Sequence, residues 1–158
     1  MALKRDLIMQ AVMTRMAGIL QTADYYSDLG GNVFEWRPKI VFEGVAGYVP
    51  TEQDELPALH IRDPLDQATV RDLSGNEDHE LTLELEIAHE GGATGQEMRR
   101  QIQDVRKAIS VDLTWGGLVR ETSQEMPAET VRVQADRTFY RTLIRTKLIY
   151  MTSAFAED

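Results

Sequence analysis

The stretch His79–Glu90, with the sequence HELTLELEIAHE, constrains the fold of this chain more than any other segment. Its apolar and polar residues alternate strictly, with Leu81, Leu83, Leu85 and Ile87 on one side and Glu80, Thr82, Glu84 and Glu86 on the other. Because successive side chains of a β-strand point to opposite faces of a sheet, this alternation predicts a strand with one buried face and one exposed, polar face. The turn-forming residues 74–78 before it predict a hairpin with residues 67–73.

Residues 5–20 and 95–110 are expected to form amphipathic helices, because apolar residues recur there at three- and four-residue spacing. Thr94 and Glu97 fit a capping box at the start of the second helix. Further strands are expected at 33–36, 57–62, 118–124, 129–134 and 137–151, with a long loop at 38–56. Runs of strands separated by single helices predict an α+β fold. We expect a single domain over residues 1–158, with one mainly antiparallel or mixed sheet and both helices packed on its apolar face.

The sequence contains no recognisable catalytic motif. It has no cysteine, which excludes disulfides, thiolate metal sites and cysteine nucleophiles. No serine lies in a G-x-S-x-G motif, and no glycine cluster matches a phosphate-binding loop or a dinucleotide-binding fingerprint. His79 and His89 would lie about 33 Å apart along the expected strand, too far to share a metal ion within one chain. We therefore expect no enzyme activity, no cofactor and no metal ion, and little loss of stability on replacing His79, His89 or Glu90.

The net charge of −9 is concentrated in the middle of the chain, since residues 51–104 hold four basic and fourteen acidic residues. This distribution argues against tight binding to a nucleic-acid backbone, which needs clustered lysine and arginine. The simpler interpretation is that the acidic charge keeps the protein soluble. The alternative is that it forms a surface past which DNA slides. Polar residues interrupt the first 20 residues, so we expect no secretion signal there, and no membrane-spanning stretch elsewhere.

Two of the expected strands carry opposite charges on their polar faces. Glu84 and Glu86 belong to the first, and Arg141, Arg145 and Lys147 belong to the last. If the two strands are neighbours, these charges pair across the sheet within one subunit. If they are not, each face is a charged patch suited to head-to-tail contacts between copies. Both interpretations stay open at this point.

The order of these segments resembles that of the tail terminator proteins of long-tailed bacteriophages, also called minor tail or tail-completion proteins. The resemblance covers nearly the whole chain. After the N-terminal helix it rests on the strand Val33–Trp36, LPALHIRD at 56–63, the alternating strand at 79–90, the helix at 95–110, LTWGGLVRE at 113–121 and TKLIYMTS at 146–153. The long insertion at 38–56 departs from the shorter arm expected in that family.

The resemblance implies a structural virion protein at the tail–neck junction, assembled in the host cytoplasm. Such a protein forms a hexameric ring that caps the tail tube, ends tail polymerisation and joins the tail to the head connector, while DNA passes through the ring. Its implied partners are further copies of itself, the tail tube protein, head–tail connector or neck proteins, and the tail sheath where one is present. The alternatives are another neck or head–tail connector protein, and a cytoplasmic ligand-binding or enzymatic domain.

Within this frame, Phe42 and Tyr48 in the loop 38–56 become candidates for contacts with a neighbouring subunit or with the tube. The loop combines apolar side chains with an acidic tip and shows no clear periodicity. We expect it to become ordered on assembly, and we expect the charged residues Glu84, Glu86, Arg141, Arg145 and Lys147 to be further interface candidates.

Overall fold

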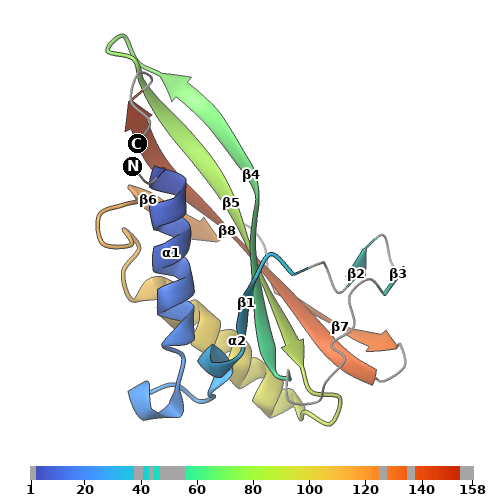
Figure 1. Cartoon of the computed structure of the whole chain (residues 1–158). Coiled ribbons are helices and arrows are strands. Elements are labelled where there is room, and N and C mark those ends of the chain that lie inside the picture. The colour runs from blue at the N-terminus through green and yellow to red at the C-terminus, as the bar shows by residue number, and fades with distance from the viewer. Residues whose placement is uncertain are drawn as a thin grey trace.

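Three long strands form the centre of the molecule in the computed structural model (Figure 1). They are β4 (Ala58–Arg71), β5 (Asn76–His89) and β8 (Thr138–Ser153). The structure describes residues 3–37, 41–42, 45–46, 56–124, 128–134 and 138–153. The predicted alternating strand is β5, and the predicted hairpin is formed by β4 and β5.

The remaining strands complete a six-stranded, mostly antiparallel sheet. Its order is β1 (Val33–Glu35), β4, β5, β8 and β6 (Glu121–Gln124), and β7 (Glu129–Gln134) pairs with β8 on the same side as β6. The pair β1–β4 is parallel and all other pairs are antiparallel. This mixed, open sheet with two helices confirms the predicted α+β class. A separate pair of short strands, β2 (Val41–Phe42) and β3 (Val45–Ala46), lies within the range predicted to be a loop.

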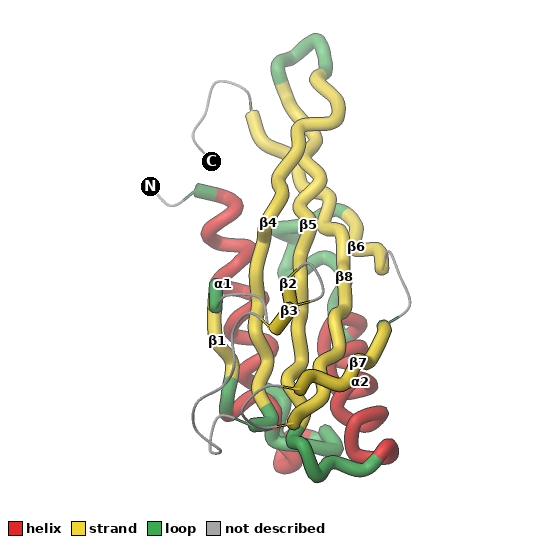
Figure 2. Tube along the Cα trace, turned by 90° about the vertical axis from the view of Figure 1, so that its right-hand side faces the viewer, coloured by secondary structure: helices red, strands yellow, loops and turns green. Residues whose placement is uncertain are grey.

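Both α-helices cover one face of this sheet, as the sequence predicts (Figures 1 and 2). They are α1 (Lys4–Ala17) and α2 (Gly95–Ser110), and two short 3-10 helices, η1 (Gln21–Ala23) and η2 (Leu29–Gly31), follow α1. The main core lies between the helices and the sheet, where Leu83 and Leu85 of β5 belong to one apolar cluster with Val105 of α2. The predicted capping box of α2 is present: Glu97 N–H donates to Thr94 Oγ1, and Thr94 N–H donates back to the Glu97 carboxylate.

A smaller apolar cluster lies on the opposite face of the sheet. Its members are Leu56, Ala58, Ala88, Val133 and Phe139, with Phe34 packed against them. Val133 comes from β7 and Phe34 from β1, the two strands at opposite edges of the sheet. The sheet is therefore apolar on both faces at this end, whereas the sequence pattern had indicated a single apolar face.

Several element boundaries differ from the sequence-based expectation for local reasons. Helix α1 stops at Ala17, three residues early, because the chain turns at Gly18, whose N–H bonds to Arg15 O. The hairpin turn is shorter than predicted, because the Asp72 carboxylate accepts from the N–H groups of Ser74 and Asn76 and closes the turn by residue 76. Residues 76–78, predicted to be part of the turn, therefore pair with β4 and β8.

The β4–β5 hairpin extends past the helices as a narrow arm (Figure 1). At its tip Leu73 is fully exposed. Apart from β2 and β3, the predicted loop at 38–56 lies almost entirely outside the described residues, so its expected ordering on assembly stays a prediction. Among the described helices, none is long and apolar enough to cross a membrane.

Candidate interaction site

The charged residues singled out from the sequence lie on the sheet face that the helices leave uncovered. β5 and β8 are neighbours, and Glu84 is directly opposite Arg145. Arg141 Nε lies 2.6 Å from a Glu86 oxygen, and Arg145 Nε lies 3.8 Å from a Glu84 oxygen. Lys147 Nζ lies 2.6 Å from Glu80. Of the two interpretations left open by the sequence, pairing within one subunit describes these six side chains.

Arg62 of β4 completes this network, and the sequence reasoning missed it. Its guanidinium lies 3.0 Å from a Glu86 oxygen and 3.4 Å from a Glu84 oxygen, and it also donates to the carbonyl of Arg37. Arg62 is opposite Glu84 in the β4–β5 register, so the pairing follows from the hairpin geometry. The register of the β4–β5 hairpin is the information that would have identified Arg62 from the sequence.

The expectation that this face is exposed is wrong for Glu84 and Glu86. Glu86 is completely buried and Glu84 is 4% exposed, and Arg62 is buried beside them. A buried carboxylate needs a charged or hydrogen-bonding partner, and here each has arginine on two sides. The network therefore holds β4, β5 and β8 together, which leaves little free charge for a partner at these residues.

The other predicted interface residues are Phe42 and Tyr48. Phe42 is part of β2, but its side chain lies outside the described part of the chain. Tyr48 also lies outside the described residues. Their role as contacts with a subunit or with the tube stays a prediction.

The two histidines of β5 have structural partners at opposite ends of the strand. His79 stacks on Tyr150 with ring centres 4.9 Å apart, and its ring nitrogens lie 3.3 Å from Asp66 and 3.0 Å from Thr152. The Tyr150 hydroxyl donates to Asp66, and burial together with this bond raises the pKa of Tyr150. Over the residues that the structure describes, no three acidic or histidine side chains are grouped so as to hold a metal ion.

His89 is fully buried, which contradicts the surface position on which the expectation of a small stability loss was based. Its ring nitrogens lie 2.5 Å from Gln101 Oε1 of α2 and 2.8 Å from Thr142 Oγ1 of β8. Burial lowers the pKa of His89. The apolar residues of the alternating pattern end at Ile87. Nothing in the sequence indicates that His89, the next residue on the same face of β5, is also buried beneath α2.

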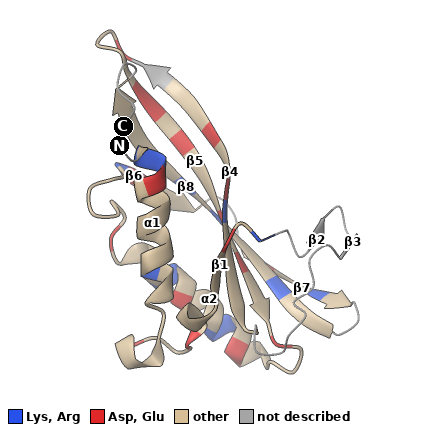
Figure 3. Cartoon of the chain, in the orientation of Figure 1, with Lys and Arg blue, Asp and Glu red and all other residues tan. Residues whose placement is uncertain are grey.

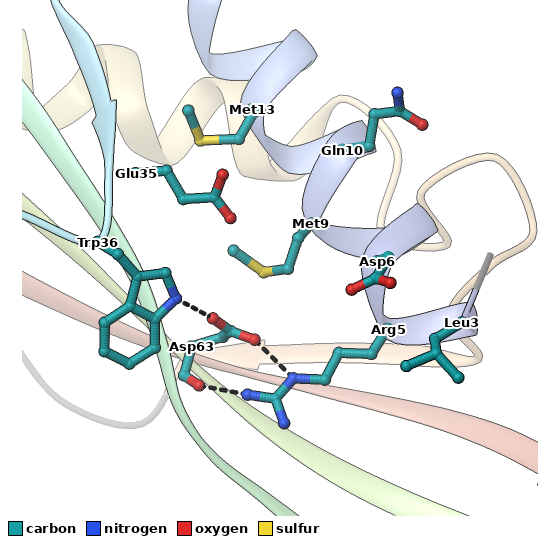
Figure 4. A pocket seen from close by; sticks show the side chains of 9 residues that line it. All are labelled: Leu3, Arg5, Asp6, Met9, Gln10, Met13, Glu35, Trp36 and Asp63. Atoms are coloured by element: carbon teal, nitrogen blue, oxygen red, sulfur yellow. Dashed lines mark hydrogen bonds and ion pairs between the residues drawn. The ribbon is translucent and has the colours of Figure 1, made fainter.

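An open groove lies at the β1 edge of the sheet, between α1, β1 and β4 (Figure 4). Its volume is about 690 Å³. Figure 4 shows side chains from the three elements around it: Leu3, Arg5, Asp6, Met9, Gln10 and Met13 from α1 and the residue before it, Glu35 and Trp36 from β1 and the residue after it, and Asp63 from β4. Their separation in sequence is the reason that sequence reasoning did not find this site.

Asp63 holds the inner wall of the groove in place. One carboxylate oxygen accepts the Trp36 indole N–H at 2.7 Å, and the other accepts from Arg5 Nε at 2.6 Å. A second Arg5 nitrogen donates to the Asp63 carbonyl at 2.7 Å. Trp36 has a left-handed backbone conformation with φ of 56° and its side chain remains half exposed. Helix α1 and the end of β1 are thus fixed to one residue of β4.

The groove combines methionine side chains with two exposed carboxylates. Met9 is nearly buried and Met13 is partly buried, while Leu3 is about half exposed. Asp6 and Glu35 are both exposed, and neither has an ion pair or a side-chain hydrogen bond with any described residue. Such a groove suits a positively charged side chain on an extended segment, because methionine adapts to its shape and the carboxylates bind its charge.

The opposite edge of the sheet carries an exposed cation. Arg132 of β7 is exposed and has no ion pair within the described residues. Figure 3 shows basic positions on the β7–β8 hairpin and acidic positions on α1, β4 and β5. The edge strand β1 thus has an exposed carboxylate at Glu35, and the edge strand β7 has an exposed cation at Arg132, three residues after the exposed Glu129.

The sequence matches no known family model, and no curated protein is significantly similar to it.

Proposed function

We propose that the chain is a structural protein of a bacteriophage tail, which forms a hexameric ring at the end of the tail tube. The ring ends tail polymerisation and joins the tail to the head connector, and DNA passes through its centre. The proposal begins from the sequence resemblance to tail terminators. It is supported by the order of the elements: an N-terminal helix, an edge strand, a long hairpin, a second helix and a long closing strand.

The observation that carries the proposal is the difference between the two edges of the sheet. A closed ring needs a heterologous interface, in which two unlike surfaces of each copy meet around the circle. Among the described residues, no strand pairs with the outer side of β1 or with the outer side of β7. Each copy thus offers two different open edges, one with the exposed carboxylate of Glu35 and one with the exposed cation of Arg132.

The overall charge of −9 agrees with a ring that DNA traverses without being held. A strongly basic lumen would bind the phosphate backbone tightly and slow the passage of DNA. Arg132, which has no ion pair within the described residues, lies on an edge strand where another protein can reach it.

The mass of the assembly tests this proposal. The purified chain is measured by native mass spectrometry and light scattering, alone and after addition of the tail tube protein of the same phage. We expect a six-copy species in at least the second condition, and electron microscopy should show it at the end of the tubes. A chain that stays monomeric with tube protein present would contradict the proposal.

One observation favours a ligand-binding domain as a second candidate. The groove beside α1 has a volume in the range of small-molecule sites, about 690 Å³, and holds acidic and apolar side chains together. In that case the protein is monomeric under all conditions, and a small cationic ligand raises its melting temperature. Replacing Glu35 by glutamine would abolish such a thermal shift.

A further inference from the structure

The backbone of β1 offers hydrogen-bonding groups at the outer edge of the sheet. The Asn32 carbonyl and the Trp36 N–H both bond to β4 at 2.8 Å. In a parallel pair, alternate residues of an edge strand direct their N–H and C=O groups to the neighbour, and the residues between direct theirs outward. The outward groups of β1 therefore belong to Val33 and Glu35.

The same alternation can be followed across the sheet to β7. On β4 the residues on either side of His60 bond to β1, so His60 itself bonds to β5. By the pairing registers, the backbone N–H and C=O groups of the odd-numbered residues of β5 point toward β8. In the same way, the backbone groups of the odd-numbered residues of β8 point toward β7, and those of the odd-numbered residues of β7 point toward β8. The outward backbone groups of β7 consequently belong to Thr130, Arg132 and Gln134.

The side chains of these outward residues lie on the same face of the sheet at both edges. Thr130 Oγ1 lies 2.6 Å from Thr142 Oγ1, which is beneath α2, so the even-numbered side chains of β7 are on the helix face. At the other edge Val33 packs into the helix-covered core and Glu35 lines the groove beside α1. Two copies can therefore join edge to edge with both backbone bonding and face orientation satisfied.

We propose that β7 of one copy pairs with β1 of the next copy as an antiparallel strand, and that its Arg132 enters the acidic groove beside α1. The strand directions fit, because β7 runs opposite to β8 and β4, and β1 runs parallel to β4. The occupant of the groove is thus a second copy of this chain. This inference rests on the proposed ring function and assigns the two surfaces that the ring would use.

Charge and packing select one register of this pairing. If Arg132 is opposite Glu35 of the next copy, Gln134 is opposite Val33 and Val133 is opposite Phe34. The arginine then lies near two carboxylates that have no partner within the described chain, Glu35 and Asp6. Val133 belongs to the apolar cluster on the other face of the sheet and Phe34 packs against that cluster, so the cluster continues across the contact.

Cysteine trapping in the full chain tests the register. The chain contains no cysteine, so Val33→Cys and Gln134→Cys together introduce the two thiols that the proposal places opposite each other. Opposed residues of a bonded antiparallel pair have Cα atoms about 5.5 Å apart, within the range of a disulfide. We expect oxidation to give a ladder of covalent multimers, since each copy carries both halves of the contact. The control pair Val33→Cys with Gln103→Cys, on the exposed side of α2, should give none.

Charge exchange tests the role of the groove. Arg132→Glu and Glu35→Arg should each reduce the fraction of assembled protein at least tenfold, and the double variant should restore most of it. Arg99→Glu, which removes an exposed cation of α2 that takes no part in the assigned pairing, should leave assembly unchanged. Thermal unfolding of each variant verifies that the fold is retained.

The outcomes separate this inference from the proposed function. A ladder of covalent multimers and a charge-exchange rescue support the assigned contact. If the same assembly fails to cap tail tubes, that failure contradicts the proposed function but not the contact. Rings that form with tube protein but show neither ladder nor charge effect would overturn the β7–β1 contact and leave the proposed function standing. Dimers without longer species would also overturn it, because they indicate a two-fold contact.

Discussion

Arg15 of α1 lies over the indole ring of Trp115, with its guanidinium carbon 3.6 Å from the ring centre. Trp115 is buried in the loop that follows α2, and its own backbone has a left-handed conformation with φ of 51°. The same guanidinium donates to the carbonyl of Asp112 at 2.7 Å, just beyond the end of α2. One side chain thus joins the first helix to the end of the second.

Replacing Arg15 by methionine should lower the free energy of unfolding by about 1.5–3 kcal/mol. Methionine keeps the length of the side chain but loses the cation–π contact and the charged hydrogen bonds to the end of α2. Urea unfolding measures the loss. Arg99→Met on the exposed side of α2 is the matched control and should change stability by less than about 0.5 kcal/mol. Equal effects of the two substitutions would show that the Arg15 contacts contribute nothing.

Leu83 and Leu73 provide a second matched pair, since Leu83 is completely buried in β5 and Leu73 is completely exposed at the hairpin tip. Leu83→Ala should cost about 2–5 kcal/mol, because it removes buried apolar contacts and leaves a cavity beneath the helices. Leu73→Ala should be neutral within about 0.5 kcal/mol. A large loss at Leu73 in the isolated chain would mean that the tip is covered, contrary to the structure.

The sequence pattern predicted the fold where local signals were strong. Strict alternation over 79–90 located β5, and the Thr94–Glu97 capping box located the start of α2 within one residue. The pattern failed where a boundary depends on a side chain that bonds to nearby backbone groups. Asp72 closes the hairpin turn early, and neither the pattern of β4 nor that of β5 indicates this.

The candidate site could not be predicted, because its parts are far apart in the sequence. Arg5 and Asp63 are joined across 58 residues, and Trp36 reaches Asp63 across 27. The glutamates of β5 correctly predicted a polar face, but the burial of this face depends on Arg62 of β4, which no sequence pattern singles out. Periodicity reports which face a side chain occupies and carries no information on what covers that face.

Stability should fall as the pH is lowered from 7.5 to 5.5, and His89 should account for part of this fall. Burial lowers the pKa of His89 in the folded protein below its ordinary value of 6.5. The unfolded chain therefore binds a proton more readily in this range, so acid favours unfolding by up to about 1.4 kcal/mol. The stability that His89 contributes is therefore fully present above the pKa of this histidine in the unfolded chain, and it is lost as the pH falls below that pKa.

The difference between wild type and His89→Gln isolates this contribution, because the other titrating groups are common to both proteins. Urea unfolding at the two pH values should give the variant a smaller loss than the wild type. An identical pH dependence in the two proteins would mean that His89 does not titrate differently on unfolding.

Deleting Gly44–Glu52 should leave the domain folded and impair assembly, as expected if this segment contacts a neighbouring copy or the tube. Circular dichroism and thermal unfolding report the fold, and native mass spectrometry with tube protein reports assembly. Loss of folding in the deleted chain would assign the segment to the core instead.

The ionic network on the uncovered sheet face leads to a last prediction, which compares two glutamates of one strand. Glu86 is completely buried between Arg62 and Arg141, whereas Glu80 forms a partly exposed pair with Lys147. Glu86→Gln removes the charge that two buried or partly buried arginines share, and such a loss costs about 3–5 kcal/mol. Glu80→Gln removes a pair that water already screens, which costs at most about 1 kcal/mol. Chemical unfolding of both variants at neutral pH measures the difference, and comparable losses would mean that the network at Glu86 is as accessible to water as the pair at Glu80.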